Sequence, residues 1–256
     1  MITQGSHSPE HGNGKMMYQE SVIHKKKLNL DNDNHVEEYF MAKWVLFGFG
    51  NYISDIFDMI HAHHDLVKAV VKNFEPTEEQ LADIKRRIAL LGYEIPIVDL
   101  NKFDPTPGER YIYGFHTGRE KVLQSLEDTY RIKFSNLIHP SAYIGSNVGL
   151  GRGICIGPHT VIAPNVRIEN FSSINRSCSI GHDTEIGEFV TISPGVSIAG
   201  LVRIGERTTI GIGAVVIDKI RVGSDSFIGA GAVVVRDVPD HVVSVGVPAK
   251  TIREIK

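Results

Sequence analysis

The sequence predicts a small, Rossmann-like α/β domain of the βαβ type, followed by a left-handed parallel β-helix built from hexapeptide repeats. Three observations predict the β-helix. Every sixth residue from Ile138 to Val234 is Ile, Leu or Val, without one slip in register. The next residue is often Gly, and the residue four positions after each aliphatic is usually small or β-branched. Helices repeat near every 3.6 residues and strands every two, so a period of six indicates internal repetition.

The chain begins with a segment that predicts no regular structure. Residues 1–41 are polar and rich in Gly, His and Asn, as in "GSHSPEHGNGK" and "DNDNH". We expect a disordered extension, and we assign no function to it.

Residues 42–134 predict a small α/β domain with a mostly parallel sheet. The apolar run "WVLFG", a Gly turn, the helically spaced "NYISDIFDMIHAHH" and the apolar "LVKAVVKN" indicate a βαβ unit. A helical "TEEQLADIKRRIALLG", the short apolar runs "IPIVDL" and "RYIYGF", and a helical "REKVLQSLEDTY" complete the pattern.

Residues 135–237, called the coil below, predict the β-helix. Each hexapeptide supplies one short strand and one corner, with the aliphatic side chain pointing inward and a Gly permitting the tight corner. Three hexapeptides make a turn, so we expect about six turns, a buried aliphatic stack and no long protruding loop. Residues 238–256 leave the period and predict a capping tail.

Composition limits the function. The 256 residues carry a formal net charge of −3, which gives no electrostatic drive toward nucleic acid or an anionic membrane, so we expect a small-molecule substrate. Cys155 and Cys178 are too few for a disulfide framework. No apolar stretch reaches the roughly 18 to 20 residues of a membrane span. We expect a cytoplasmic protein without membrane insertion.

Several motifs resemble the bacterial hexapeptide-repeat acyltransferases. They are "GAGAVVVRDVP", the tail "GVPAK", the linker "NLIHPSAYIG", and Asn175 followed by "RSCSIG", His182 and Asp183. The best match is the group of sialic-acid O-acetyltransferases and nucleotide-amino-sugar N-acetyltransferases. The resemblance implies acetyl transfer from acetyl-CoA to a hydroxyl or amine of a sugar or nucleotide sugar. It also implies a homotrimer with a shared site, an acceptor-binding α/β domain, His182 as general base and Asp183 as its support.

The residue types of this pair fit the chemistry of acyl transfer. The nucleophile must lose a proton, which a histidine accepts near neutral pH, and a carboxylate stabilises the resulting imidazolium. Adjacent side chains on a strand point oppositely, so the pair requires a corner, which Gly181 directly before it permits. Backbone N–H groups are expected to stabilise the oxyanion. Two alternatives stay open: an inert, solvent-exposed His182, and a coil that serves only as a scaffold or binding module.

The resemblance also implies binding residues. It places the donor, acetyl-CoA, at Thr191, Gly200, Ile212 and Ala230, and the acceptor at Asn175, Gly48, Gly50, Asn51 and Gly114. A glycine-rich turn before a helix presents N–H groups to an anion, although a plain tight turn fits equally. The chain departs from the group where Asn51 and Tyr52 replace Gly and His, and where Lys72 and Asn73 replace an acidic pair. A uridine-diphosphate sugar is therefore not specified.

No functional metal is expected. The γ-type carbonic anhydrases, a second enzyme class on this fold, need three His, two of them five residues apart. The positions five residues from His182 are Ser177 and Gly187, which excludes that pattern. The "HAHH" cluster lies on a predicted helix and is expected to bind metal only adventitiously; its members are His61, His63 and His64.

Overall fold

The computed structural model describes residues 41–48, 50, 52–115 and 118–255. Apart from Met41, the extension predicted over 1–41 lies outside the described residues. The small domain is built on a parallel sheet in the order β3-β2-β1-β4, which confirms the predicted topology. Its strands are β1 (Lys43–Phe47), β2 (Leu66–Lys72), β3 (Ile97–Asp99) and β4 (Glu109–Tyr113).

Three elements connect these strands: α1 (Ile53–Ala62), α2 (Glu78–Ala89) and the 3-10 turn η1 (Leu100–Lys102). Helix α3 (Arg119–Tyr130) then leads from β4 to the coil. A reciprocal cap starts α2, because the Thr77 hydroxyl accepts from the Gln80 N–H and the Gln80 side chain accepts from the Thr77 N–H. The prediction that the whole "HAHH" cluster is helical is wrong, since α1 ends at Ala62 and His64 takes a left-handed φ of 61°. None of the described helices is long and apolar enough to cross a bilayer.

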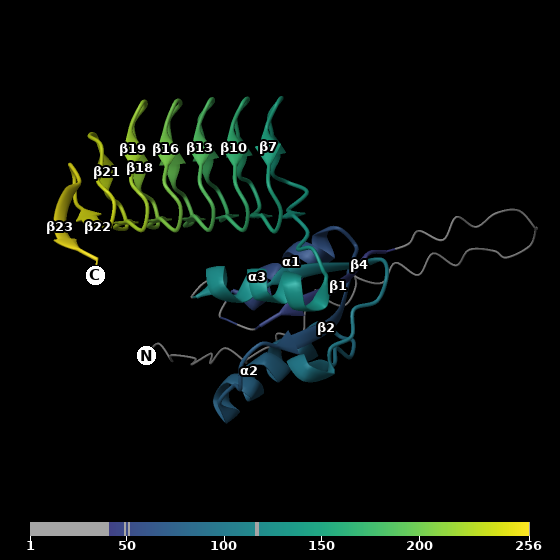
Figure 1. The fold of residues 1–256 in the computed structure, drawn as a ribbon. Coiled ribbons are helices and arrows are strands. Elements are labelled where there is room, and N and C mark those ends of the chain that lie inside the picture. Colours follow the sequence, from purple (N-terminus) through teal and green to yellow (C-terminus); the bar gives the residue numbers. More distant parts are fainter. Residues whose placement is uncertain (1–40, 49, 51, 116–117, 256) are drawn as a thin grey trace, which may run out of the picture. The chain divides into compact units, whose positions relative to one another are not determined.

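The coil consists of two-residue strands that stack in three parallel sheets, one rung every 18 residues (Figure 1). We name the sheets by their outer surfaces. The covered face comprises β5 (Leu137–Ile138), β8 (Cys155–Ile156), β11 (Ser173–Ile174), β14 (Thr191–Ile192), β17 (Thr209–Ile210) and β20 (Phe227–Ile228). The apolar face comprises β6 (Tyr143–Ile144), β9 (Val161–Ile162), β12 (Ser179–Ile180), β15 (Ser197–Ile198), β18 (Val215–Val216) and β21 (Val233–Val234). The charged face comprises β7 (Gly149–Leu150), β10 (Arg167–Ile168), β13 (Glu185–Ile186), β16 (Arg203–Ile204) and β19 (Arg221–Val222).

The second residue of each strand points into the coil, as the sequence period predicts. Ile186 and Ile204, for example, are 1% and 3% exposed. The predicted burial is incomplete in the first rung, where Ile138, Ile144 and Leu150 are only partly buried because no earlier rung covers them. Interior hydroxyls are paired with backbone carbonyls of the coil, at Thr160, Ser172, Thr184 and Thr208. The core is therefore continuous and its polar groups are satisfied.

The corners between strands contain residues in the left-handed region, which Asn and Asp tolerate better than most other L-residues. Asn147, Asn165 and Asp183 occupy equivalent places, with φ values of 56°, 63° and 56°. Their side chains form a ladder along the coil: the Asn147 amide donates to Asn165 Oδ1 over 2.9 Å, and the Asn165 amide donates to Asp183 Oδ1 over 3.1 Å. Stacking thus ties each corner to the next.

The end of the chain extends the covered face. After the period ends, β22 (Val242–Val245) pairs in parallel with β20, and β23 (Lys250–Glu254) pairs antiparallel with β22. Before β22 begins, Val238 forms an isolated parallel β-bridge with Val222 of β19. The tail therefore continues the hydrogen-bonded ladder beyond the last hexapeptide.

Aromatic side chains join the small domain to the covered side of the coil. The Tyr113 hydroxyl donates to the carbonyl of Phe171 over 2.9 Å, and both residues are buried. Phe171 stacks on Phe189 one rung later, with ring centroids 5.2 Å apart. Phe134, in the linker, packs edge-on against Phe171. The C-terminal end of β4 is therefore fixed against the coil.

Candidate functional site

His182 and Asp183 lie at the corner between β12 and β13, where the sequence argument required them. Their side chains point to the same side because Asp183 is left-handed, with φ 56°. His182 Nδ1 lies 2.7 Å from Asp183 Oδ2, and the two side chains are 62% and 44% exposed. An ionised carboxylate only accepts, so Nδ1 carries the proton of neutral His182 and Nε2 keeps a lone pair. Nε2 is therefore available as a base.

The Asp183 carboxylate is held in its charged form. Hydrogen bonds from His182 and then from the Asn165 amide lower the pKa of Asp183 below its ordinary value. At neutral pH the carboxylate therefore stays ionised and can stabilise an imidazolium beside it.

Gly200 lies one rung above His182 and contacts its ring. A Cβ on Gly200 would lie 2.7 Å from His182 Nε2 and 2.8 Å from Cε1, closer than side-chain atoms approach. The resemblance assigned Gly200 to the donor, and the structure shows that glycine here also makes room for the imidazole. The position is predictable from the sequence, because rungs repeat every 18 residues.

A cavity of about 920 Å³ opens at the C-terminal ends of β1, β2 and β4. It lies where the chain crosses from one side of β1 to the other, the usual ligand position in parallel α/β sheets. The Gly50 N–H donates to the Gly114 carbonyl over 2.8 Å, which holds the two loops together. Its lining residues are Gly50, Tyr52, Asp55, Asn73, Phe74, Gln80, Gly114, Phe115, Gly118, Val122, Asn175, Thr191 and Ser193.

The cavity brings together three predicted acceptor residues and one predicted donor residue: Gly50, Gly114, Asn175 and Thr191. Gly48 lies behind the wall, at φ 69°, where a Cβ would meet Asn73 Oδ1 at 2.6 Å and the Phe115 ring at 2.7 Å. The predicted Asn51 lies outside the described residues. This turn therefore needs glycine for close packing as well as for its backbone conformation.

Sequence reasoning missed several polar cavity residues. Asp55 and Gln80 come from α1 and α2, and burial raises the pKa of Asp55, opposed by Arg176 at 3.8 Å. Asn73 Oδ1 is buried against Gly48, behind the wall, and has no hydrogen-bond partner among the described residues. The signal was the end of each parallel strand, which marks Asn73 directly after β2.

His182 and Asp183 are not among the described residues that line this cavity. Asn175 and Ser193 lie at the corner between the covered and apolar faces, whereas His182 lies at the next corner, between the apolar and charged faces. The predicted donor residues divide in the same way: Gly200 stacks on His182, while Ile212 and Ala230 follow the corner of Asn175. Within one chain, His182 therefore lies at a different corner from the cavity.

At the corner of Asn175, three successive rungs have glycine at the left-handed position, which we call the glycine track. Gly195, Gly213 and Gly231 succeed one another at left-handed positions, with φ between 65° and 69°. A Cβ at any of them would meet no described atom within 4 Å. The equivalent positions at other corners carry side chains such as Leu201. A narrow, open surface therefore runs along the coil from Ser193 toward Ala230.

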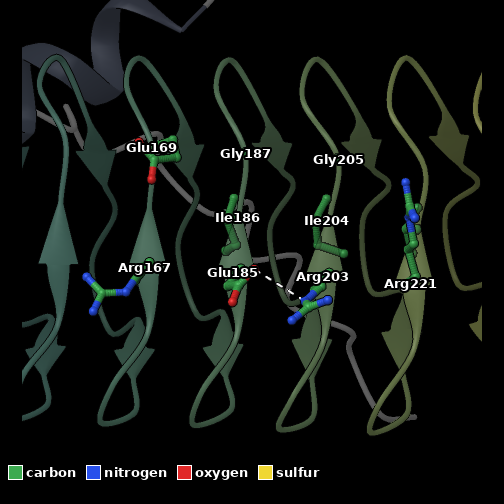
Figure 2. Close-up of a pocket in the computed structure, with 10 residues that line it drawn as sticks. Arg167, Glu169, Glu185, Ile186, Gly187, Arg203, Ile204, Gly205 and Arg221 are labelled. Atoms are coloured by element: carbon green, nitrogen blue, oxygen red, sulfur yellow. Dashed lines mark ion pairs between the residues drawn. The ribbon is translucent and has the colours of Figure 1, made fainter.

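A second groove, of about 570 Å³, lies on the charged face (Figure 2). Arg167, Glu185, Arg203 and Arg221 follow one another along it, and Arg203 Nε lies 3.3 Å from Glu185 Oε2. None of the residues predicted for catalysis, donor or acceptor is among its described lining residues. The arginines outnumber the carboxylates of Glu169 and Glu185 along the groove, and Gly187 and Gly205 also line it.

Comparison with known sequences identifies the repeat. The family described as bacterial transferase hexapeptide (six repeats) matches residues 202–236. Serine acetyltransferase of Buchnera aphidicola is 32% identical over 131 residues, which cover 50% of this chain and 44% of that enzyme. The match thus spans less than half the length of this relative.

Solved structures match over both parts of the chain. PerB from Caulobacter crescentus, in complex with CoA and GDP-perosamine, is 28% identical, with a TM-score of 0.69 over 83% of this chain and 98% of that chain. The acetyltransferase domain of PglB from Neisseria gonorrhoeae, in complex with acetyl coenzyme A, is 24% identical, with a TM-score of 0.57 over 83% and 100%, and shows the fold alone. The predicted left-handed β-helix and the resemblance to hexapeptide-repeat acyltransferases are confirmed.

Proposed function

We propose that this chain is an acetyl-CoA-dependent acetyltransferase that acetylates the amine of a nucleotide-linked amino sugar in the cytoplasm. One observation carries the proposal: PerB, solved with CoA and GDP-perosamine, matches the small domain and the coil together, over 98% of its own length. Variants of that enzyme with one histidine replaced were solved with the same two molecules. The sequence alone left a hydroxyl acceptor open, and the amino sugar of PerB favours the amine.

The chemistry follows from the His182–Asp183 pair. The acceptor nitrogen attacks the thioester carbonyl, the C–N bond forms, and His182 Nε2 takes the proton that the nitrogen loses. The C–S bond then breaks, and the proton passes from the imidazolium to the CoA sulfur. Asp183 stabilises the imidazolium between these steps, and backbone N–H groups stabilise the oxyanion. No covalent enzyme intermediate is needed.

The cavity suits the acceptor. The phosphates of the nucleotide sugar would lie at the turn of Gly50, beside the N-terminus of α1. Backbone N–H groups and the helix dipole favour an anion there. Asn73 and Gln80 line the same cavity, and amide side chains can hydrogen-bond a nucleobase. Asn175 and Ser193 then face the sugar from the coil side.

A homotrimer completes the site, since the base and the cavity lie at different corners of one chain. The apolar face spans these two corners, and its outward residues carry no charge: Tyr143, Val161, Ser179, Ser197, Val215 and Val233. Three of them are exposed although apolar, Tyr143 at 61%, Val161 at 44% and Val215 at 39%. Packing three apolar faces around a threefold axis brings the partner's His182 to the cavity corner. Acetyl-CoA would then lie between Gly200 of one copy and the glycine track of another.

Sedimentation tests this assembly. Val161→Lys buries a charge in the proposed interface and should convert the trimer to monomers with loss of turnover. Arg203→Glu changes charge on the charged face and should leave the trimer intact. A wild-type protein that sediments as a monomer at assay concentrations would overturn the shared site.

The activity is tested by release of CoA thiol from acetyl-CoA with matched acceptors. The panel holds amino sugars linked to GDP, UDP and dTDP, the same sugars with a hydroxyl in place of the amine, and the free amino sugars. We expect turnover with at least one nucleotide-linked amine, and not with its hydroxyl analogue or free sugar. Turnover of the hydroxyl analogue alone would replace N-transfer by O-transfer. No turnover with any member would leave the scaffold alternative.

A further inference from the structure

Two arginines tie helix α3 to the coil, one near each end of the helix. Arg119 begins α3 and is 2% exposed. Its Nη2 donates to the carbonyls of Phe189 at 2.6 Å and Val190 at 3.1 Å, and to the Thr191 hydroxyl oxygen at 3.1 Å. The guanidinium also lies over the Tyr113 ring, 5.8 Å from its centroid. One buried cation therefore contacts β4 and the coil together.

These contacts join the two walls of the cavity. Gly118 and Val122, on either side of Arg119, line the cavity from α3, and Thr191 lines it from the coil. Gly118 caps α3 with φ 65° and makes no side-chain cap bond, so the start of the helix depends on its neighbours. Arg119 thus sets the separation between the helix wall and the coil wall.

Arg119 also orients Thr191. A hydroxyl has one donor hydrogen, and its oxygen here accepts from Arg119 Nη2. The O–H of Thr191 is then directed away from the guanidinium and serves as a donor. Because Thr191 lines the cavity, a ligand oxygen is a fitting acceptor for it.

The second arginine offers a matched control. Arg152, in the coil, donates from Nε to both carboxylate oxygens of Glu127 on α3 at 3.0 Å, and it lies over the Phe171 ring at 5.0 Å. It therefore joins the same helix to the same coil through hydrogen bonds and a ring contact, although its acceptor is a carboxylate and its side chain is 36% exposed. Neither Arg152 nor Glu127 is among the described residues lining the cavity.

We infer that Arg119 is a positioning residue for the acceptor: it fixes the cavity walls and turns the Thr191 hydroxyl toward an oxygen of the bound sugar or phosphate. The inference rests on the proposed function for its substrate. Lysine is a poor replacement for Arg119, because an ammonium lacks the planar guanidinium that lies over the Tyr113 ring while its Nη2 reaches the coil. The role is geometric, and Arg119 does not handle the transferred proton.

Steady-state kinetics test the inference with Arg119→Lys, Arg152→Lys, Thr191→Val and Thr191→Ser. Arg119→Lys and Thr191→Val should raise the acceptor KM about tenfold, the effect of one lost charge-assisted or substrate hydrogen bond. Thr191 is also predicted to contact acetyl-CoA, so a rise confined to the acetyl-CoA KM would assign its hydroxyl to the donor and overturn the inference. Thr191→Ser should restore the acceptor KM. Arg152→Lys should lower the melting temperature and leave both KM values unchanged. Equal acceptor KM values in the two arginine variants would overturn the inference.

Amide hydrogen exchange decides the case independently of turnover. Arg119→Lys should speed exchange at residues 189–193 and 118–123, whereas Arg152→Lys should not. If wild type acetylated no nucleotide-linked amine and this difference persisted, the proposed function would fail and the role of Arg119 in fixing the cavity would stand. Unchanged exchange in Arg119→Lys would overturn that role, whatever the activity.

Discussion

The coil and the small α/β domain assemble their functional groups by different means. In the coil, groups that act together lie on neighbouring rungs, as Asn165 does to Asp183 and Gly200 to His182, with 18 residues between equivalent places. In the α/β domain, the cavity forms where strands from distant parts of the sequence end, at Gly50, Asn73 and Gly114. Substitutions that disturb the repeat are therefore expected to disrupt the coil, and substitutions that loosen side-chain packing are expected to disrupt the cavity.

The largest expected effect tests the register of the coil with two neighbouring residues of β16. Ile204→Asp places an unpaired charge in the aliphatic stack, which costs several kcal/mol and should unfold the coil. Arg203→Asp places the same group on the exposed side and should cost less than about 1 kcal/mol. Thermal melts followed by circular dichroism compare the two. Similar melting temperatures would show that the interior and exterior of the strand are misassigned.

The next largest expected effect is on proton transfer from the acceptor. His182→Ala should lower kcat by about 10²- to 10⁴-fold, the range for a positioned base, with acetyl-CoA binding unchanged. The control is His159→Asn, at another corner, where Asn tolerates the left-handed φ of 57°. That variant should keep wild-type kcat. If both substitutions had the same effect, His182 would be an ordinary corner histidine.

A smaller effect is expected one rung above His182. Gly200→Ala places a Cβ 2.7 Å from His182 Nε2, so the ring must move and kcat should fall about 10- to 100-fold. Gly213→Ala adds the same carbon at a place where no described atom lies within 4 Å, so it should not displace His182. A change in the acetyl-CoA KM of this variant would instead report contact between acetyl-CoA and the glycine track. A crystal structure of the Gly200 variant would show the displaced ring. An unmoved ring with full activity would contradict the packing argument.

The same difference explains what the sequence could predict. The period of six identified the inward residues and the corners. Because His182 and Asp183 are adjacent in sequence, their side chains were predicted to pair only at a corner, and the structure shows them paired at one. Stacking would also have placed Gly200 beside His182, had the 18-residue repeat been followed one rung further. The first rung departs from the pattern, because burial of Ile138 depends on a neighbour that the repeat does not supply.

The cavity was less predictable because its members share no spacing. Asp55 and Gln80 look like ordinary helix-surface residues until α1 and α2 are placed around the sheet. Gly50, Asn73 and Gly114 carried a usable signal, because each follows the end of a parallel strand. The separation of His182 from Asn175 was predictable from the sequence, because residues about one hexapeptide apart lie at successive corners of a three-sided coil. Sequence patterns thus predict groups within a rung better than groups that meet between domains.

The smallest effect concerns the contact between the two regions, and it depends on pH. The Glu127 side chain is 2% exposed, and burial alone would raise its pKa. Hydrogen bonds from Arg152 and the Phe134 N–H, with Lys133 nearby, outweigh burial and hold the pKa below its ordinary value.

A carboxyl whose folded pKa is depressed stabilises the fold above its unfolded pKa, near 4.3, and loses that contribution as pH falls through the folded value. Glu127→Gln should therefore cost about 1 kcal/mol at pH 7, because the amide keeps a hydrogen bond and loses the charge. Urea melts should show a constant difference in the free energy of unfolding between wild type and Glu127→Gln above about pH 6, and a shrinking one below about pH 4. A gap that widened toward acid would mean that burial dominates and that Glu127 is protonated in the folded protein.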